Sequence, residues 1–218
     1  MQDRLKLPDA KLRVVRNGIN VADLEPPESA PPTAVIGYLA RMCFGKGLPR
    51  LVDAFIELKK RDTVANVSLH IAGAKTEADQ PLVDQLSDRL KAAGCRDDVT
   101  FSPNISRDEK RVFLQSLTVL SVPATYGESF GLYIIEAMAC GVPVVQPRHG
   151  AFPELIEATG GGVLCEPDDT QSLADALQAL LLDPERRSVL SKAARQGVEE
   201  HFSVATMADG LLEVYGEL

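Results

Sequence analysis

Two glutamates eight positions apart, Glu128 and Glu136, are the residues best suited to chemistry. They lie in Tyr-Gly-Glu-Ser-Phe-Gly-Leu-Tyr-Ile-Ile-Glu-Ala-Met-Ala-Cys-Gly-Val-Pro-Val-Val at 126–145, a pattern typical of a loop, a helix and then a buried strand. The N–H groups of Gly131 and Leu132 would lie at the start of that helix, where unpaired donors and the helix dipole suit a phosphate. A nearby carboxylate suits the paired hydroxyls of a ribose or sugar. The segment therefore predicts a nucleotide-sugar site.

Glu136 needs a partner that its own helix does not supply. It lies between Ile135 and Ala137 in a strongly apolar helix, where a charged group is seldom buried alone. No basic residue stands one turn away at position 132 or 140, so a helical ion pair is absent. A ligand hydroxyl would be such a partner. The competing interpretation is a surface loop acid followed by an ordinary helix acid.

A second candidate is the loop Gly-Tyr-Leu-Ala-Arg-Met-Cys-Phe-Gly-Lys-Gly at 37–47, between a strand and a helix. A diphosphate leaving group carries two or more negative charges, which a metal or fixed cations must absorb. No Asp-x-Asp pair follows a predicted strand, so we assign the diphosphate to Arg41 and Lys46. Arginine offers a planar fork to phosphate oxygens, and lysine acts as a point charge. Alternatively, both are solvated loop residues.

Composition argues against several classes of protein. The 218 residues fit one domain with one core, and the net charge of −8 disfavours a nucleic-acid surface. No apolar run approaches the roughly 20 residues of a membrane span, and the N-terminus lacks a signal-peptide core. The four cysteines and three histidines are scattered without metal-ligand spacing. We therefore expect no metal, no cofactor and a cytoplasmic protein.

The apolar pattern predicts the elements that must position these residues. A Pro-rich stretch at 26–32 cannot be helix or central strand, and short strands alternate with amphipathic helices after it. The expected strands cover 13–15, 34–38, 67–72, 99–101, 118–122, 143–146 and 162–164. The expected helices cover 47–61, 80–93, 130–139, 153–157, 170–182, 184–201 and 203–218, and another opens at the capping-box match 106–109.

This alternation predicts an α/β fold: a single domain with a Rossmann-like, doubly wound parallel sheet covered on both faces. Such sheets bind ligands at the carboxyl ends of their strands. The candidate residues follow successive strands there. The two cations come after the first main strand, Gly73 after the second, Asn104 after the third and Glu128 after the fourth.

At these residues the chain resembles the C-terminal domain of the family-4 (group 1) retaining glycosyltransferases, which have the two-domain GT-B fold. The resemblance runs from Val-Arg-Asn-Gly-Ile-Asn at 15–20 to the last helix. Its most specific part is the Glu-x7-Glu motif from Glu128 to Glu136, followed by Ala-Met-Ala-Cys-Gly-Val-Pro-Val-Val. Where the family usually has Pro, Gly and Glu, this chain departs at three loop positions: Arg16, Ala40 and Gly45.

The resemblance implies roles for individual residues. The donor diphosphate would contact the two cations and the amides of Gly131 and Leu132, while Glu136 binds the ribose and Glu128 lies by the transferred sugar. Asn104 and Ile105 would border the base. The residues expected to bind substrate are Arg41, Lys46, Gly73, Asn104, Ile105, Glu128, Ser129, Phe130, Gly131, Leu132 and Glu136, and those expected to act in catalysis are Arg41, Lys46 and Glu128. It also implies metal-independent transfer with retention, in which the leaving diphosphate helps to deprotonate the acceptor.

The resemblance further implies a partner domain. Family enzymes have an N-terminal Rossmann-like domain that binds the acceptor, whereas this sequence predicts one sheet. We expect a lead-in strand and linker over 1–32, a nucleotide-sugar-binding domain over 33–202, and a helix at 203–218 that crosses to the missing domain. The donor would be a UDP-, GDP- or ADP-sugar, and the chain alone would turn over poorly. Contact with the inner membrane face through the missing half stays open.

Other hypotheses remain. A nucleotide-sugar-binding or regulatory module could keep the pocket without catalysis. Another GT-B relative, such as a sugar-nucleotide epimerase or a phosphorylase, is a third possibility, although no lysine has the context expected for pyridoxal phosphate. An unrelated receiver or flavodoxin-like domain fits the topology but leaves the Glu-x7-Glu motif unexplained.

Overall fold

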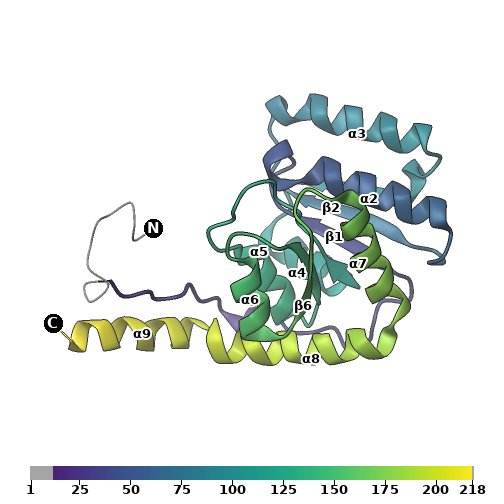
Figure 1. The fold of residues 1–218 in the computed structure, drawn as a ribbon. Coiled ribbons are helices and arrows are strands. Elements are labelled where there is room, and N and C mark those ends of the chain that lie inside the picture. The colour runs from purple at the N-terminus through teal and green to yellow at the C-terminus, as the bar shows by residue number, and fades with distance from the viewer. Residues whose placement is uncertain (1–11, 218) are drawn as a thin grey trace.

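A computed structural model describes residues 12–217. In this part of the chain, six parallel strands form one sheet with helices on both faces (Figure 1). The strands are β1 (Val35–Leu39), β2 (Ser68–Gly73), β3 (Val99–Pro103), β4 (Val119–Leu120), β5 (Val144–Pro147) and β6 (Gly162–Cys165). Their order in the sheet is β3-β2-β1-β4-β5-β6. The predicted single-domain, Rossmann-like, doubly wound sheet is confirmed.

The strand order reverses between β1 and β4, which pair directly at Ile36 with Val119 and at Gly37 with Leu120. From β1 the chain crosses to β2 on one side, and from β4 it crosses to β5 on the other. The loops that leave these two strands therefore diverge, and the crevice between them is where open α/β sheets bind ligands. Both predicted cations lie in the loop after β1, and Glu128 lies in the loop after β4.

Helices begin and end close to the predicted boundaries. They are α2 (Leu48–Arg61), α3 (Gln80–Ala92), α4 (Arg107–Gln115), α5 (Leu132–Ala139), α6 (Phe152–Thr159), α7 (Thr170–Leu182), α8 (Pro184–His201) and α9 (Val204–Gly216). The capping box before α4 is confirmed, because the Ser106 Oγ accepts the Glu109 N–H at 3.3 Å and the Glu109 carboxylate accepts the Ser106 N–H at 2.7 Å. On the sheet, α2 packs beside α7, while α5 and α6 pack against α8.

The core explains why the strands are apolar runs rather than alternating sequences. Ile36 and Tyr38 in β1, like Ile71 in β2, are fully buried, and so are Val144 and Val145 on consecutive positions of β5. Because successive side chains of a strand point to opposite faces, both faces of the sheet must be covered.

Two local predictions were wrong. The helix predicted from residue 130 begins at Leu132, because Gly131 takes a left-handed conformation with φ 94° and serves as its N-cap. Residues 13–15, predicted as a strand, lie outside any strand. The nearest pairing is a single parallel bridge between Ile19 and Ser203.

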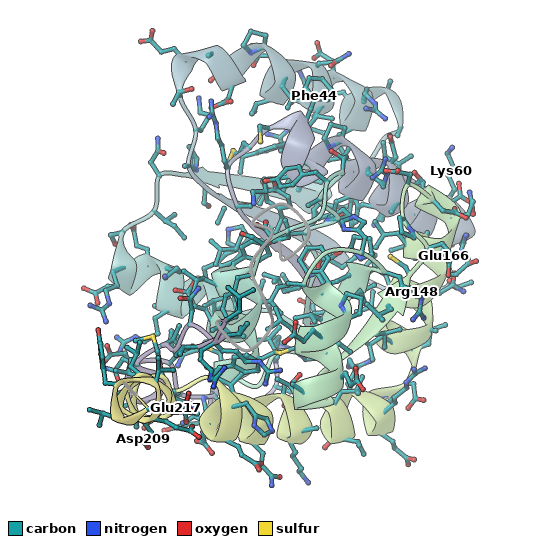
Figure 2. The ribbon with its side chains drawn as sticks, turned by 60° about the vertical axis from the view of Figure 1, so that its left-hand side comes forward. Phe44, Lys60, Arg148, Glu166, Asp209 and Glu217 are labelled. Carbon is teal, nitrogen blue, oxygen red and sulfur yellow. The ribbon has the colours of Figure 1, made fainter. Side chains whose placement is uncertain are left out.

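Helix α9 lies at the edge of the molecule, as Figure 1 shows and as Asp209 and Glu217 mark in Figure 2. It contains no buried residue in its described length, and Leu212 and Tyr215 expose 68% and 69% of their surface. The extended segment at 12–18 runs beside it, with an ion pair of 2.7 Å from Arg13 to Glu217. That α9 crosses to another domain stays a prediction. None of the described helices is both long and apolar enough to cross a bilayer.

Candidate functional site

The loops after β1 and β4 meet through an ion pair between the Lys46 Nζ and the Glu128 Oε2. Only 21% of the Lys46 side chain and 11% of the Glu128 side chain are exposed. The Tyr133 hydroxyl donates a hydrogen bond to the same Glu128 oxygen at 3.1 Å. The Lys46 ammonium also lies 5.2 Å and 5.6 Å from the ring centres of Tyr126 and Tyr133. A cation and a carboxylate from loops that are far apart in the sequence thus form a mostly buried ion pair.

The protonation states of this cluster follow from its contacts. Burial by itself lowers the pKa of Lys46, but the interactions with Glu128 and Tyr126 outweigh burial and raise it. Burial raises the pKa of Tyr133, and the adjacent Glu128 charge raises it further. Lys46 is therefore a cation at neutral pH, and Tyr133 is a neutral hydroxyl that donates to the carboxylate.

Main-chain contacts hold the loop after β1 against the loop after β4. The short helix η3 (Phe44–Lys46) ends at Gly47, which has a φ of 73°. A Cβ on Gly47 would lie 1.7 Å from the Pro123 carbonyl oxygen, so only glycine fits this approach. The Thr125 N–H donates to the Gly45 carbonyl at 3.0 Å. Backbone geometry thus holds the two loops together and brings Lys46 close to Glu128.

A third loop, between β5 and α6, contacts the backbone of Glu128. The Ala151 N–H donates to the Glu128 carbonyl at 2.9 Å, and a Cβ on Gly150 would lie 2.5 Å from the Glu128 nitrogen. The His149 Nε2 lies 2.9 Å from the Ala124 carbonyl oxygen. These supports were not among the predicted site residues. A glycine just after a strand end, as at Gly150, is the sequence signal that could have found them.

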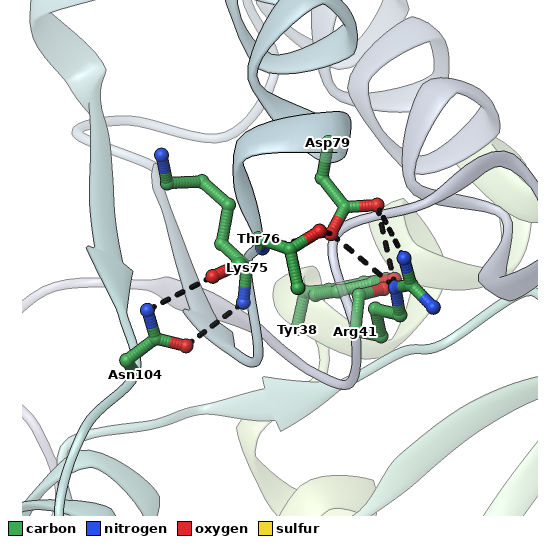
Figure 3. Close-up of polar contacts among 6 residues, drawn as sticks. All are labelled: Tyr38, Arg41, Lys75, Thr76, Asp79 and Asn104. Atoms are coloured by element: carbon green, nitrogen blue, oxygen red, sulfur yellow. Dashed lines mark hydrogen bonds and ion pairs between the residues drawn. The ribbon is translucent and has the colours of Figure 1, made fainter.

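Arg41, the other predicted cation, pairs with Asp79 at the start of α3 (Figure 3). Its Nε lies 3.3 Å from both carboxylate oxygens, and its Nη2 lies 3.1 Å from Oδ1. Asp79 also accepts hydrogen bonds from the Thr76 N–H and hydroxyl. These Thr76 contacts, followed by Arg41, lower the pKa of Asp79 to about 2. The sequence prediction missed Asp79, although Thr-x-x-Asp is a recognisable capping pattern.

Glu136 contacts a lysine from a neighbouring helix. The Lys110 Nζ of α4 lies 2.6 Å from the Glu136 Oε1, with 28% and 19% of the two side chains exposed. This protein partner was not predicted from the sequence, and binding of a ligand hydroxyl by Glu136 stays a prediction. Both residues line an open cavity of about 510 Å³, together with Asn20, Asp23 and Arg107.

The start of α5 keeps the backbone geometry that a phosphate site needs. Gly131 is its N-cap, and no side chain among the described residues caps this end of the helix. Leu132 and Ser129 are exposed. The Phe130 side chain instead packs edge-on against Phe202, with ring centres 5.9 Å apart. Of this group, only Phe130 has an evident packing role.

The predicted residues at the ends of β2 and β3 tie loops together. Gly73 has a φ of 131°, and a Cβ there would lie 2.0 Å from the Ala40 carbonyl oxygen. The Asn104 side-chain amide accepts from the Lys75 N–H at 2.9 Å and donates to the Lys75 carbonyl at 3.0 Å (Figure 3). Ile105 is half-buried and lines a cavity of about 390 Å³. The Asn104 side chain therefore holds the loop after β3 against the loop after β2.

The predicted charged residues are thus divided among three ion pairs: Lys46–Glu128, Arg41–Asp79 and Lys110–Glu136. All three join segments that follow the carboxyl ends of strands, but only the first joins two predicted residues to each other. Within residues 12–217, no group of three or more His, Cys, Asp or Glu side chains is placed to hold a metal ion.

Comparison with known proteins places this geometry in context. The family model described as "Glycosyl transferases group 1" matches residues 23–197. The D-inositol 3-phosphate glycosyltransferase of Saccharomonospora viridis is 31% identical over 221 residues, which cover 96% of this chain and 51% of that protein. The glycogen synthase of Mycobacterium tuberculosis is 31% identical over 208 residues, with coverage of 94% and 48%. The chain therefore spans about half the length of these relatives.

Solved structures share the fold. The C-terminal domain of the group 1 glycosyl transferase LpcC from Francisella tularensis is 25% identical, with a TM-score of 0.76 and coverage of 86% of this chain and 100% of that one. HepE of Anabaena, solved in complex with UDP, is 22% identical, with a TM-score of 0.87 and coverage of 99% and 60%.

Proposed function

This chain belongs to the group 1 glycosyltransferases, and from that membership we propose that it binds a nucleotide-diphosphate sugar as the donor for sugar transfer. The observation that carries the proposal is the contact between Lys46 and Glu128. It puts a cation suited to a diphosphate beside a carboxylate suited to a sugar, at the reversal of strand order where such sheets bind ligands. No other ion pair within residues 12–217 joins two of the predicted residues.

In this proposal the diphosphate contacts Lys46, Arg41 and the start of α5. Lys46 carries its charge at neutral pH, because its pKa is raised. No side chain among the described residues caps the start of α5, where the Ile134 N–H donates to the Gly131 carbonyl at 2.9 Å. The preceding N–H groups of Leu132 and Tyr133 are left as donors at the positive end of a helix dipole.

The two motif carboxylates take the sugars. Glu136 would bind the ribose hydroxyls, and the open cavity that it shares with Lys110 leaves room for them. Glu128 would lie beside the transferred sugar, held by the Tyr133 hydroxyl when Lys46 turns toward phosphate. Each role is supported by a partly exposed carboxylate whose present partner is a lysine, a contact that a ligand can share or replace.

We propose that transfer is metal-independent and retains the anomeric configuration. The bond from the anomeric carbon to the diphosphate oxygen breaks, and a bond to the acceptor oxygen forms on the same face of the sugar. The acceptor proton passes to the leaving diphosphate. Lys46 and Arg41 would stabilise the charge on that leaving group. Turnover that persists in EDTA and a product with the anomeric configuration of the donor are the expected results.

The acceptor would bind to a second domain. Support comes from α9, whose exposed Leu212 and Tyr215 offer apolar surface at the edge of the molecule. The chain alone would therefore bind the donor weakly and transfer little sugar. A cytoplasmic location also stays a prediction, since it depends on composition and cysteine usage.

Thermal stability in the presence of ligands tests the donor role. The panel is UDP-, GDP- and ADP-sugars with their free nucleotides, and a ligand at 100 times its dissociation constant adds about 2.7 kcal/mol of stability. We expect the nucleoside diphosphate to account for most of the shift and Lys46→Ala to remove it. If no compound in the panel shifts the wild type, the donor role is wrong. A non-catalytic binding module would instead show the shift but no sugar transfer in the protein joined to its acceptor domain. In an enzyme, Glu128→Gln should lower turnover more than donor affinity.

A further inference from the structure

The Arg41 guanidinium is held along one edge by a buried acid that comes from a different loop. Its Nε contacts both Asp79 oxygens at 3.3 Å, and its Nη2 contacts Oδ1 at 3.1 Å (Figure 3). Only 7% of the Asp79 side chain is exposed, against 54% of the Arg41 side chain. The arginine therefore has one fixed edge and one open end. Its Nη1 has no hydrogen-bond partner among the described residues.

Asp79 is itself held by contacts that do not involve Arg41. Its Oδ2 accepts the Thr76 N–H at 2.8 Å and the Thr76 hydroxyl at 2.7 Å, which forms a capping box at the helix η4 (Glu77–Asp79). The Arg41 backbone is fixed as well, because the hydroxyl of the buried Tyr38 donates to its carbonyl at 2.7 Å. Both ends of the Arg41–Asp79 contact are thus anchored to rigid parts of the fold.

The same two loops are joined by their main chains. The Met42 N–H donates to the Ala74 carbonyl at 2.9 Å, and Gly73 lets the chain pass directly against the Ala40 carbonyl. On the far side, the Asn104 amide holds Lys75 through two hydrogen bonds. The loop that carries Asp79 is therefore braced on both sides, so the carboxylate is a stable anchor for the arginine.

A capping box does not by itself require an arginine. The chain has a second one, Ser106 with Glu109, in which Glu109 accepts the Ser106 N–H in the same way. Among the described contacts of that glutamate, none is with a guanidinium. The arginine at Asp79 is thus an additional feature, and it comes from the loop that the diphosphate is proposed to contact.

We propose that Asp79 is a positioning residue, which holds Arg41 so that its open end meets the donor diphosphate. This inference rests on the proposed function. A free arginine loses rotamer freedom when it binds a phosphate, whereas an arginine already held along one edge has lost that freedom on folding. The Asp79 carboxylate also partly neutralises the guanidinium charge, and this effect by itself would weaken phosphate binding. Because the Arg41 side chain is largely exposed and the charge effect is screened there, we expect orientation to dominate.

Isothermal titration of the chain tests this role. The probes are UDP, GDP and ADP, and then the monophosphate of whichever base binds tightest. We expect Asp79→Asn and Arg41→Ala each to weaken diphosphate binding about tenfold, the change expected from losing a hydrogen bond to a charged group. Monophosphate binding should change less than about twofold, because the second phosphate is absent. The double variant should bind no more weakly than Arg41→Ala, since Asp79 acts through Arg41.

Two further variants separate orientation from general loosening of the fold. Thr76→Val removes the hydroxyl that fixes Asp79, so we expect about threefold weaker diphosphate binding, and no effect in the Arg41→Ala background. This variant tests the role even if Asp79→Asn fails to fold. Asp183→Asn is the control. It removes a carboxylate that caps α8 by accepting the Arg186 N–H at 2.8 Å, and it should leave both affinities unchanged.

The outcomes are distinguishable. If the wild type binds none of the three diphosphates, the proposed function fails and this inference fails with it. If Arg41→Ala loses diphosphate affinity while Asp79→Asn and Thr76→Val keep it, the inference alone is wrong. Tighter binding by Asp79→Asn would mean that the acid competes with phosphate, which also overturns it. Equal losses for diphosphate and monophosphate would show that the acid only stabilises the loop.

Discussion

Lys46 and Glu128, which are 82 positions apart in the sequence, form an ion pair across the reversal of strand order in the sheet. Both side chains are mostly buried, and the Tyr133 hydroxyl donates a hydrogen bond to the Glu128 carboxylate. Because both groups have little contact with water, each charge is stabilised mainly by the other. Removing each charge singly, and then both together, therefore measures how strongly the two interact.

Lys46→Ala should destabilise the chain by about 1–3 kcal/mol, because the Glu128 carboxylate is left mostly buried without its cation. Lys46→Ala with Glu128→Gln should recover part of that loss, since a neutral amide needs no counter-charge. Urea denaturation of the two single variants and the double variant measures the coupling. Additive effects would show that the pair contributes nothing to stability.

Gly47→Ala should distort the contact between the two loops. A Cβ there would lie 1.7 Å from a carbonyl oxygen, so a backbone shift must accompany the strain of φ 73°. Gly94 is the matched control, because it has φ 72° and a Cβ added there would meet nothing within 4 Å. Gly94→Ala should cost about 1–2 kcal/mol from backbone strain alone. Gly47→Ala should cost more and also weaken nucleoside diphosphate binding. Equal stability losses would contradict the steric argument.

Stability at acid pH should report on Asp79. Its pKa lies at about 2, below the ordinary value of 3.8, first through Thr76 and then through Arg41. A lowered carboxyl pKa adds stability that is complete above the unfolded value and is lost as pH falls through the folded value. The wild type should lose this contribution from about pH 4 to about pH 2, and Asp79→Asn should not. The stability difference between the two, measured by urea denaturation, should shrink over that window. A constant difference would refute the assignment.

Glu136→Ala should weaken binding of a ribonucleoside diphosphate about tenfold, because two ribose hydroxyls lose a charged acceptor. Binding of the matching 2′,3′-dideoxynucleotide should not change, since that analogue lacks those hydroxyls. Isothermal titration of both ligands against both proteins gives the comparison. Equal losses for the two ligands would assign Glu136 to the α4–α5 contact with Lys110 rather than to ribose.

Leu212→Ser should change the stability of this chain by less than about 0.5 kcal/mol, because the side chain is on an exposed face of α9. The fully buried Val198 of α8 is the contrast, and Val198→Ala should cost about 1–2 kcal/mol through the loss of buried methyl groups. Thermal denaturation measures both. In a protein that also contains the acceptor domain, Leu212→Ser should lower stability. If it does not, α9 makes no contact there.

The general architecture could be predicted from the sequence because its determinants are local. Runs such as Val-Ile-Gly-Tyr-Leu are apolar on both faces of a strand, and the helices between them carry an apolar stripe and recognisable caps. Those signals indicate a parallel sheet, and a parallel sheet brings the loops after its strands to one edge. The positions of Arg41, Lys46 and Glu128 at that edge therefore followed from strand boundaries alone.

The partners of the charged groups were decided only by the tertiary structure. Arg41 meets Asp79 over 38 positions, and Glu136 meets Lys110 over 26. Helical spacing predicts contacts within one helix, but these contacts depend on which face of the sheet each helix covers and how closely the loops approach. Glycines set that approach at Gly47 and Gly150, where a single Cβ would separate two backbones. The residue types determined what chemistry is available, and the packing of non-local elements decided which charges face one another.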